Sequence, residues 1–160
     1  MYDEVGPLRF GAMLFPTECT LFDSRCVRPY IGVGRKPEEK VLLYQLDVKD
    51  CPHFRVHDKS CCIYEHRPLV CRRFPVEWHR YSTKLTVSKK CPQFSGGPAG
   101  CPMGTMFPKD MVMSAIECVS TFDSDDFGHR WLYELNTQSW MEGAELLEKL
   151  KSSGLCIESV

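Results

Sequence analysis

The chain has 160 residues, of which 43% are hydrophobic, so it is long enough and apolar enough to form one core. Its net charge of -1 and its pI of about 6.5 do not favour binding to nucleic acid or to an anionic membrane surface. The start of the chain lacks the basic and apolar regions of a signal peptide, and no apolar run is long enough to span a bilayer, so we expect a cytoplasmic protein.

The first part of the chain, up to about residue 105, predicts short strands and irregular loops. Apolar and alternating segments predict strands at Tyr30–Val33, Val41–Val48 and Lys84–Val87. Arg35–Glu39 is typical of a turn, or of one helical turn, between the first two strands. Eight of the ten cysteines lie in this part, which we therefore treat as a cysteine-rich half.

The rest of the chain, from about residue 106, predicts helices. Pro108 can occupy the first turn of a helix over Lys109–Ser120, whose apolar residues fall on one face. A second helix is predicted to be capped by Ser124–Asp126 and to hold the apolar residues Trp131, Leu132 and Leu135. A last helix is expected from about Ser139 onward, with a stripe of leucines.

These elements predict an α+β fold in a single domain, residues 1–160. We expect the irregular cysteine-rich half, with its short strands, to pack on two or three C-terminal helices. The helices would then cover a site formed by the cysteine-rich half, and an apolar shell of this kind restricts solvent at a metal.

Six cysteines are the candidate metal ligands. They are Cys19, Cys26, Cys51, Cys61, Cys71 and Cys91. Thiols stay reduced in the cytoplasm, so a cysteine array there predicts metal binding, with disulfides and unrelated buried thiols as the alternatives. Thiolates are soft ligands that select zinc, copper(I) and iron–sulfur clusters.

The spacing of these cysteines favours an iron–sulfur cluster over zinc. Structural zinc sites usually join two C-x2-4-C knuckles, and the chain has no C-x-x-C pair. The charge around an iron–sulfur cluster tunes it, and Arg67 and Arg72 flank Cys71, so we expect these two arginines to contact the cofactor. The competing interpretation places the arginines in a solvated loop or pairs them with Glu65 and Glu77.

One cysteine and four histidines are weaker candidates. Adjacent side chains diverge, so we expect only one of Cys61 and Cys62 to be a ligand. The four histidines lie in or beside the array, and any one of them could replace a thiolate in a zinc site; they are His53, His57, His66 and His79. For each histidine, an exposed or hydrogen-bonded ring is the more ordinary interpretation.

The segment from Cys51 to Cys91 resembles a known family. After Cys51 come, in register, Cys61-Cys62-Ile63-Tyr64, Arg67-Pro68, Cys71-Arg72, Phe74-Pro75 and Cys91-Pro92. This pattern is similar to that of the cysteine-cluster proteins described as zinc- or iron-chelating domains, a wider group that includes flagellin lysine methylase. The family opens with a C-x-x-x-C-x-x-C-C motif, of which Cys19 and Cys26 match two cysteines, while Asp23 and Val27 replace the others. The resemblance implies metal binding more than it implies any reaction.

We therefore expect a cytoplasmic protein that carries an iron–sulfur cluster or zinc on its cysteines. A redox or methyl-transfer enzyme that uses the cluster is one alternative, with a pocket lined by Trp78, Tyr81 and Trp131. A structural or interaction module that zinc holds together is the other. The chain has no phosphate-binding loop and no hydrolase motif, and no motif identifies a substrate or a protein partner.

Overall fold

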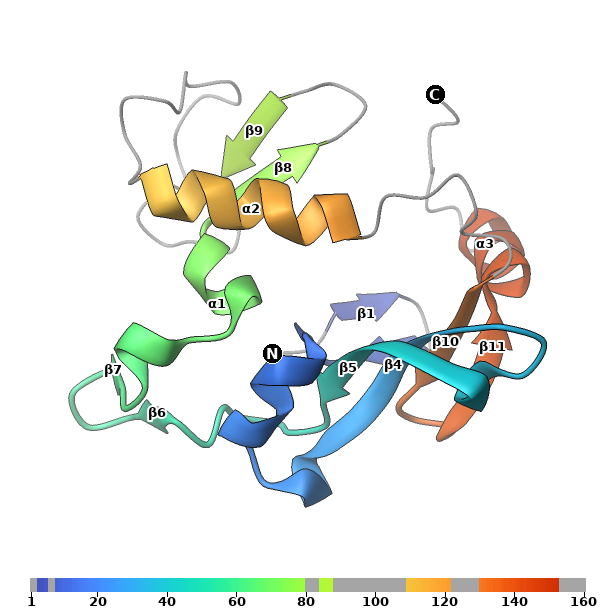
Figure 1. Ribbon diagram of the computed structural model, residues 1–160, viewed down its shortest axis with the longest axis horizontal. Helices are drawn as coiled ribbons and strands as arrows, with labels where there is room; N and C mark the ends of the chain where they lie inside the picture. The colour runs from blue at the N-terminus through green and yellow to red at the C-terminus, as the bar shows by residue number, and fades with distance from the viewer. Residues whose placement is uncertain (1–2, 6–7, 80–83, 88–108, 122–129, 153–160) are drawn as a thin grey trace. The chain divides into compact units, whose positions relative to one another are not determined.

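The computed structural model describes residues 3–5, 8–79, 84–87, 109–121 and 130–152 (Figure 1). Antiparallel sheets and a few helices make up these residues, which confirms the predicted α+β class. The chain forms two compact units. The first unit comprises Met1–His66 and Ser124–Ser159, and the second comprises Arg67–Asp123.

A five-stranded antiparallel sheet forms the centre of the first unit, in the order β11-β10-β4-β5-β3. From one edge to the other, the strands are Ser139–Glu142, Arg130–Glu134, Val27–Val33, Lys40–Leu46 and Ala12–Leu14. The hairpin formed by β10 and β11 therefore extends a sheet that the first half of the chain begins. The sequence pattern predicted a purely helical C-terminal segment. This prediction is wrong, because the segment supplies two strands of this sheet.

The three predicted strands are confirmed. The expected strands at 30–33 and 41–48 correspond to β4 and β5, and the expected strand at 84–87 is β9 (Lys84–Val87). The predicted turn between β4 and β5 contains the short 3-10 helix η3 (Pro37–Glu39). The cap expected at Ser124–Asp126 and the Pro108 start lie outside the described residues.

The helix predicted through Trp131 is wrong, because this segment is strand β10. Every second residue of the strand is buried, namely Arg130, Leu132 and Glu134. The residues between them, Trp131 and Tyr133, are half-buried. This alternation is the period of a strand and not of a helix.

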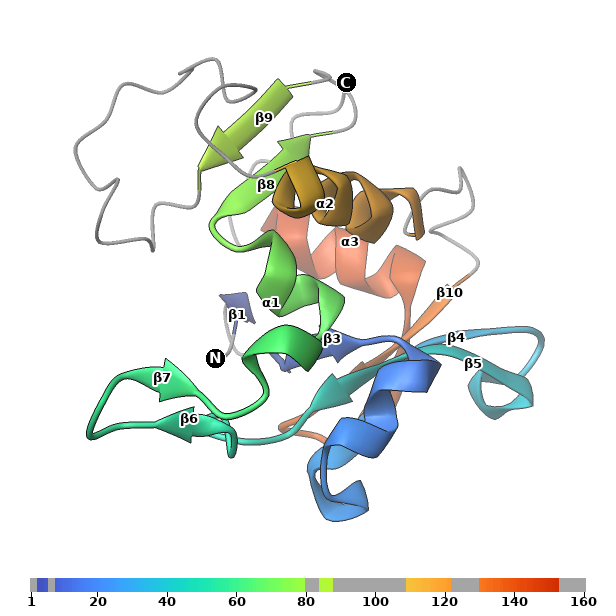
Figure 2. The same cartoon turned by 60° about the vertical axis from the view of Figure 1, so that its left-hand side comes forward.

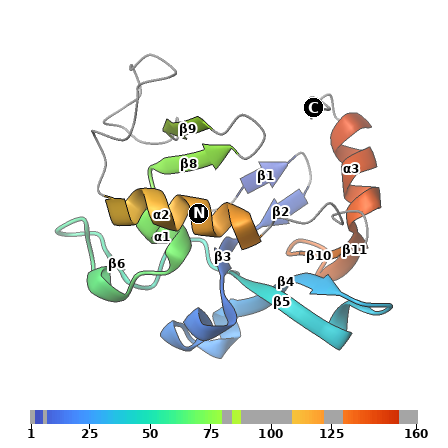
Figure 3. The ribbon, with the colours of Figure 1, turned by 45° about the horizontal axis from the view of Figure 1, so that its top comes forward.

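The last predicted helix begins later than expected. Ser139–Glu142 pairs with β10 as β11, and helix α3 (Gly143–Ser152) follows directly. Helix α3 lies beside the β10–β11 hairpin (Figure 3). Its Leu146 joins a buried cluster with Phe10, Leu132 and Met141.

The N-terminus adds a second small sheet to the first unit. Strand β1 (Asp3–Val5) pairs with β2 (Leu8–Phe10) in an antiparallel hairpin. The backbone N–H of Leu135 donates to the carbonyl of Arg9 at 3.1 Å, so β2 is linked to the end of β10.

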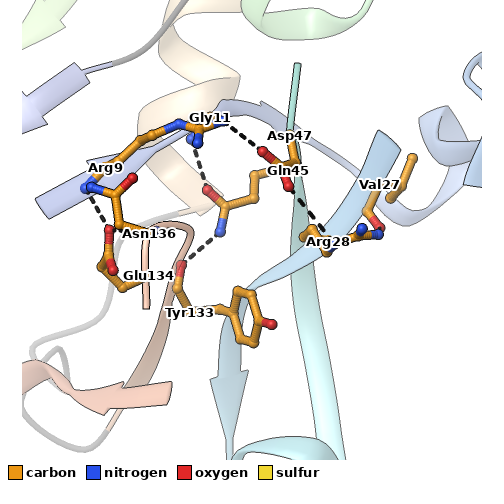
Figure 4. Close-up of polar contacts among 9 residues, drawn as sticks. All are labelled: Arg9, Gly11, Val27, Arg28, Gln45, Asp47, Tyr133, Glu134 and Asn136. Carbon is orange, nitrogen blue, oxygen red and sulfur yellow. Dashed lines mark hydrogen bonds and ion pairs between the residues drawn. The ribbon is translucent and has the colours of Figure 1, made fainter. Parts of the chain in front are cut away.

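A buried amide, that of Gln45 on β5, joins three other segments of the first unit (Figure 4). Its Oε1 accepts from the N–H of Gly11 at 2.8 Å. Its Nε2 donates to the carbonyls of Pro29 on β4 and Tyr133 on β10, at 2.8 and 2.6 Å. Each polar atom of this fully buried side chain therefore has a partner, as a stable core requires.

A buried carboxylate, that of Glu134, holds the turn between β10 and β11. It accepts from the backbone N–H groups of Arg9, Asn136 and Thr137, at 2.7, 3.0 and 2.7 Å (Figure 4 shows Arg9 and Asn136). Burial raises the pKa of this carboxyl, but the backbone donors outweigh burial and lower the pKa from its ordinary value.

The second unit contains helix α1 (Leu69–Arg73), the hairpin of β8 (Val76–His79) and β9, and helix α2 (Lys109–Thr121). Helix α2 packs against α1 and β8 and confirms the helix predicted from Lys109 (Figure 3). Among the described residues of both units, no helix has the length and apolar content needed to cross a membrane.

We expect Gln45→Leu to lower the free energy of unfolding by about 2 kcal/mol or more, because the N–H of Gly11 and two carbonyls would lose a buried partner. Urea unfolding followed by circular dichroism measures this change. Lys40→Leu, at the exposed start of the same strand, is the control and should change stability by less than about 0.5 kcal/mol. Equal effects of the two substitutions would contradict the role given to Gln45.

The lowered pKa of Glu134 predicts a pH dependence of stability. Its contribution is fully present above the ordinary value of 4.5 and is lost as the pH falls through the lower folded-state pKa. Glu134→Gln should therefore destabilise the protein more at a pH of about 7 than at a pH of about 3. Urea unfolding at both values tests this, with Glu142→Gln, exposed on the same hairpin, as the control. A pH-independent effect of Glu134→Gln would refute the prediction.

Candidate metal centre

Three cysteines of the first unit come from two segments of the chain. One segment connects β3 to β4, and the other follows β5. The 3-10 helix η1 (Pro16–Leu21) carries Cys19, and the 3-10 helix η2 (Ser24–Cys26) ends at Cys26. Cys51 lies in the segment that leads from β5 to β6. In Figure 1 the first segment is the blue helical stretch, and the second is the teal chain that passes it.

Side-chain caps fold the η1 and η2 segment into its tight turns. Pro16 occupies the first turn of η1, where its missing N–H removes no helical hydrogen bond. The carboxylate of Glu18 accepts from the N–H of Phe15 at 2.9 Å. At η2 the carboxylate of Asp23 accepts from the N–H of Arg25, also at 2.9 Å. Both caps are encoded locally by an acidic residue near the start of a turn.

The side chains of Cys19, Cys26 and Cys51 pack against one apolar cluster. The buried members of this cluster are Leu14, Phe22 and Leu46. Leu14 ends β3 and Leu46 ends β5, so the sheet positions the cluster and the cluster positions the thiols. All three cysteines are half-buried free thiols.

His53 links the Cys51 segment to η1. Its Nε2 lies 2.7 Å from the carbonyl oxygen of Leu21, and its ring centroid lies 4.9 Å from that of Phe22. Figure 2 shows the chain before β6 passing beside the blue helical segment. The carbonyl of His53 also accepts from the N–H of Cys62 at 2.8 Å. The sequence placed His53 within the array, but only the fold shows that it joins these segments.

The structure distinguishes the two adjacent cysteines. Strand β6 (Phe54–Arg55) pairs with β7 (Ser60–Cys61), and Cys61 lies opposite Phe54. Cys61 is half-buried, whereas Cys62 is exposed. Of the two, Cys61 is therefore the better candidate ligand, because restricted access of solvent favours a metal–thiolate bond.

The environment of Cys19 keeps its thiol protonated. Burial raises the pKa of Cys19, and the negative charge of Glu18 raises it further. The Sγ atom of Cys19 donates to the carbonyl of Phe15 at 3.5 Å. A metal that binds here must displace this proton, so its affinity will increase with pH.

Asp23, which stands where the resembling family has a cysteine, is engaged elsewhere. Its carboxylate is exposed and accepts from the guanidinium of Arg25 at 2.7 Å. Hydrogen bonds from the Arg25 side chain and backbone lower the pKa of Asp23 to about 2. The carboxylate is therefore an ion-pair partner in this structure.

The other predicted site residues lie apart from this cluster in the chain. Cys71 is half-buried on α1 in the second unit. Arg67 and Arg72 belong to the same unit, where Arg67 is half-buried and Arg72 is exposed. Cys91 lies outside the described residues, as does Tyr81 of the expected pocket.

The other described histidines of the first unit, His57 and His66, are exposed. His57 lies 3.5 Å from a carboxylate oxygen of Asp58 in the turn between β6 and β7, and His66 ends the 3-10 helix η4 (Tyr64–His66). Neither side chain is held in the apolar cluster as His53 is. His79 is on β8.

No preassembled metal site is present in the described parts of the chain. Nowhere among them are three or more His, Cys, Asp or Glu side chains grouped so that they could hold a metal ion. The six described cysteines are all free thiols. The fold thus brings three predicted ligands to one apolar cluster, without a finished coordination sphere.

Comparison with models of protein families, with curated proteins and with solved structures finds no match to this chain. The resemblance to the cysteine-cluster proteins therefore stays a prediction. The interpretation of the site depends on its own residues and their geometry.

We expect the thiols to react in the order that their surroundings set. Under native, metal-free conditions a maleimide should modify exposed Cys62 at least about tenfold faster than Cys19, because the thiolate is the reactive form and the raised pKa of Cys19 suppresses it. Peptide mass spectrometry after a timed reaction measures both rates. If Cys19 is labelled as fast as Cys62, the Cys19 thiol is not shielded from solvent and its pKa is not raised.

Proposed function

We propose that this protein binds a metal ion or an iron–sulfur cluster through cysteine thiolates, with Cys19, Cys26 and Cys51 as the central ligands. The observation that supports this most is that the three half-buried thiols, from separate turns of the chain, pack against the same apolar cluster. Thiolates of this kind select zinc, copper(I) or iron–sulfur clusters. The surrounding Leu14, Phe22 and Leu46 would limit the access of water to the metal.

A second observation concerns the segment that carries Cys51 and Cys61. None of its residues from 49 to 66, all of which the structure describes, is buried. Its only strands are β6 and β7, each of two residues. A segment with so little core of its own gains much from a cross-link, and a structural metal supplies one. This favours a role for the metal in holding the fold together, whether or not it also takes part in a reaction.

The set of ligands extends beyond the three central cysteines. A structural zinc ion takes four ligands, and so do the common iron–sulfur clusters. Cys61 is the next thiol in the first unit, and Cys71 and Cys91 stay predicted ligands. Arg67 and Arg72 stay predicted contacts of the cofactor. Helix α2 packs on α1, which carries Cys71, so we propose that α2 shields this thiol from solvent.

We favour an iron–sulfur cluster over zinc on the spacing of the cysteines, which lacks the knuckles of ordinary zinc sites. The proposed setting is the cytoplasm, where thiols stay reduced and available to a metal. The resemblance to zinc- or iron-chelating proteins supports the same function. A redox or methyl-transfer activity would require a cluster that cycles or a substrate pocket, and we propose metal binding alone.

We expect protein purified without oxygen to contain iron and acid-labile sulfide, or zinc without sulfide, in a fixed ratio to the chain. Cys51→Ser should lose most of this metal, because it removes one of the three thiolates at the apolar cluster. Cys62→Ser, which removes an exposed thiol one residue from Cys61, should keep it. Elemental analysis with a visible spectrum measures the content, and limited proteolysis within residues 49–66 reports whether the segment loosens.

Two results would contradict the proposal. The first is wild-type protein that contains no metal and takes up neither zinc nor iron with sulfide on reconstitution. The second is equal metal content in the Cys51→Ser and Cys62→Ser proteins. Iron together with sulfide would identify the cofactor as an iron–sulfur cluster, and zinc without sulfide would identify it as a zinc ion.

A further inference from the structure

We draw no further inference here: the strongest candidate, the surface patch given by the exposed apolar side chains of Phe54 and Val56 on the β6–β7 hairpin, carries no proposal because nothing in the described parts of the chain shows what covers it.

Discussion

The buried amide of Gln45 is the contact on which the rest of the first unit depends. It joins β5 to β4, to β10 and to the residue before β3, which come from distant parts of the sequence. The residues that follow it then fix the site. Leu46 enters the apolar cluster of the thiols, and the N–H of Asp47 donates to the carbonyl of Cys26 at 2.8 Å. The end of β5 therefore determines where these cysteines lie. A substitution that displaces β5 would also displace the cysteines.

The central sheet and the segment that carries Cys51 are stabilised in different ways. The sheet is stabilised by buried apolar side chains and by two buried polar groups, Gln45 and Glu134, whose hydrogen bonds are satisfied. The segment over residues 49–66 has no buried residue and is held by the backbone pairing of β6 with β7 and by the His53 ring. A metal at Cys51 would add the covalent-like link that this segment lacks, and would couple the order of the segment to metal supply.

The sequence pattern predicted β4, β5 and helix α2 because apolar residues there follow one clear period. It failed at β10 for a physical reason. Arg130 and Glu134 occupy the buried face of that strand with Leu132 between them, so two of these three buried positions are charged and not hydrophobic. Trp131, Leu132 and Leu135 then imitate a helical spacing. Only the hydrogen bonds made by Glu134 within the fold explain why a charged residue is buried there.

The sequence by itself determined the chemistry that is available, namely many thiols, no zinc knuckle and a near-neutral charge. It could not rank the six candidate cysteines, because ligands are chosen by proximity in space and these residues are far apart in the chain. Tertiary structure decided that Cys19, Cys26 and Cys51 share one cluster and that Cys62 faces solvent. It also decided that His53 joins the Cys51 segment to η1, since its partner, the carbonyl of Leu21, is supplied by a segment that only folding brings near.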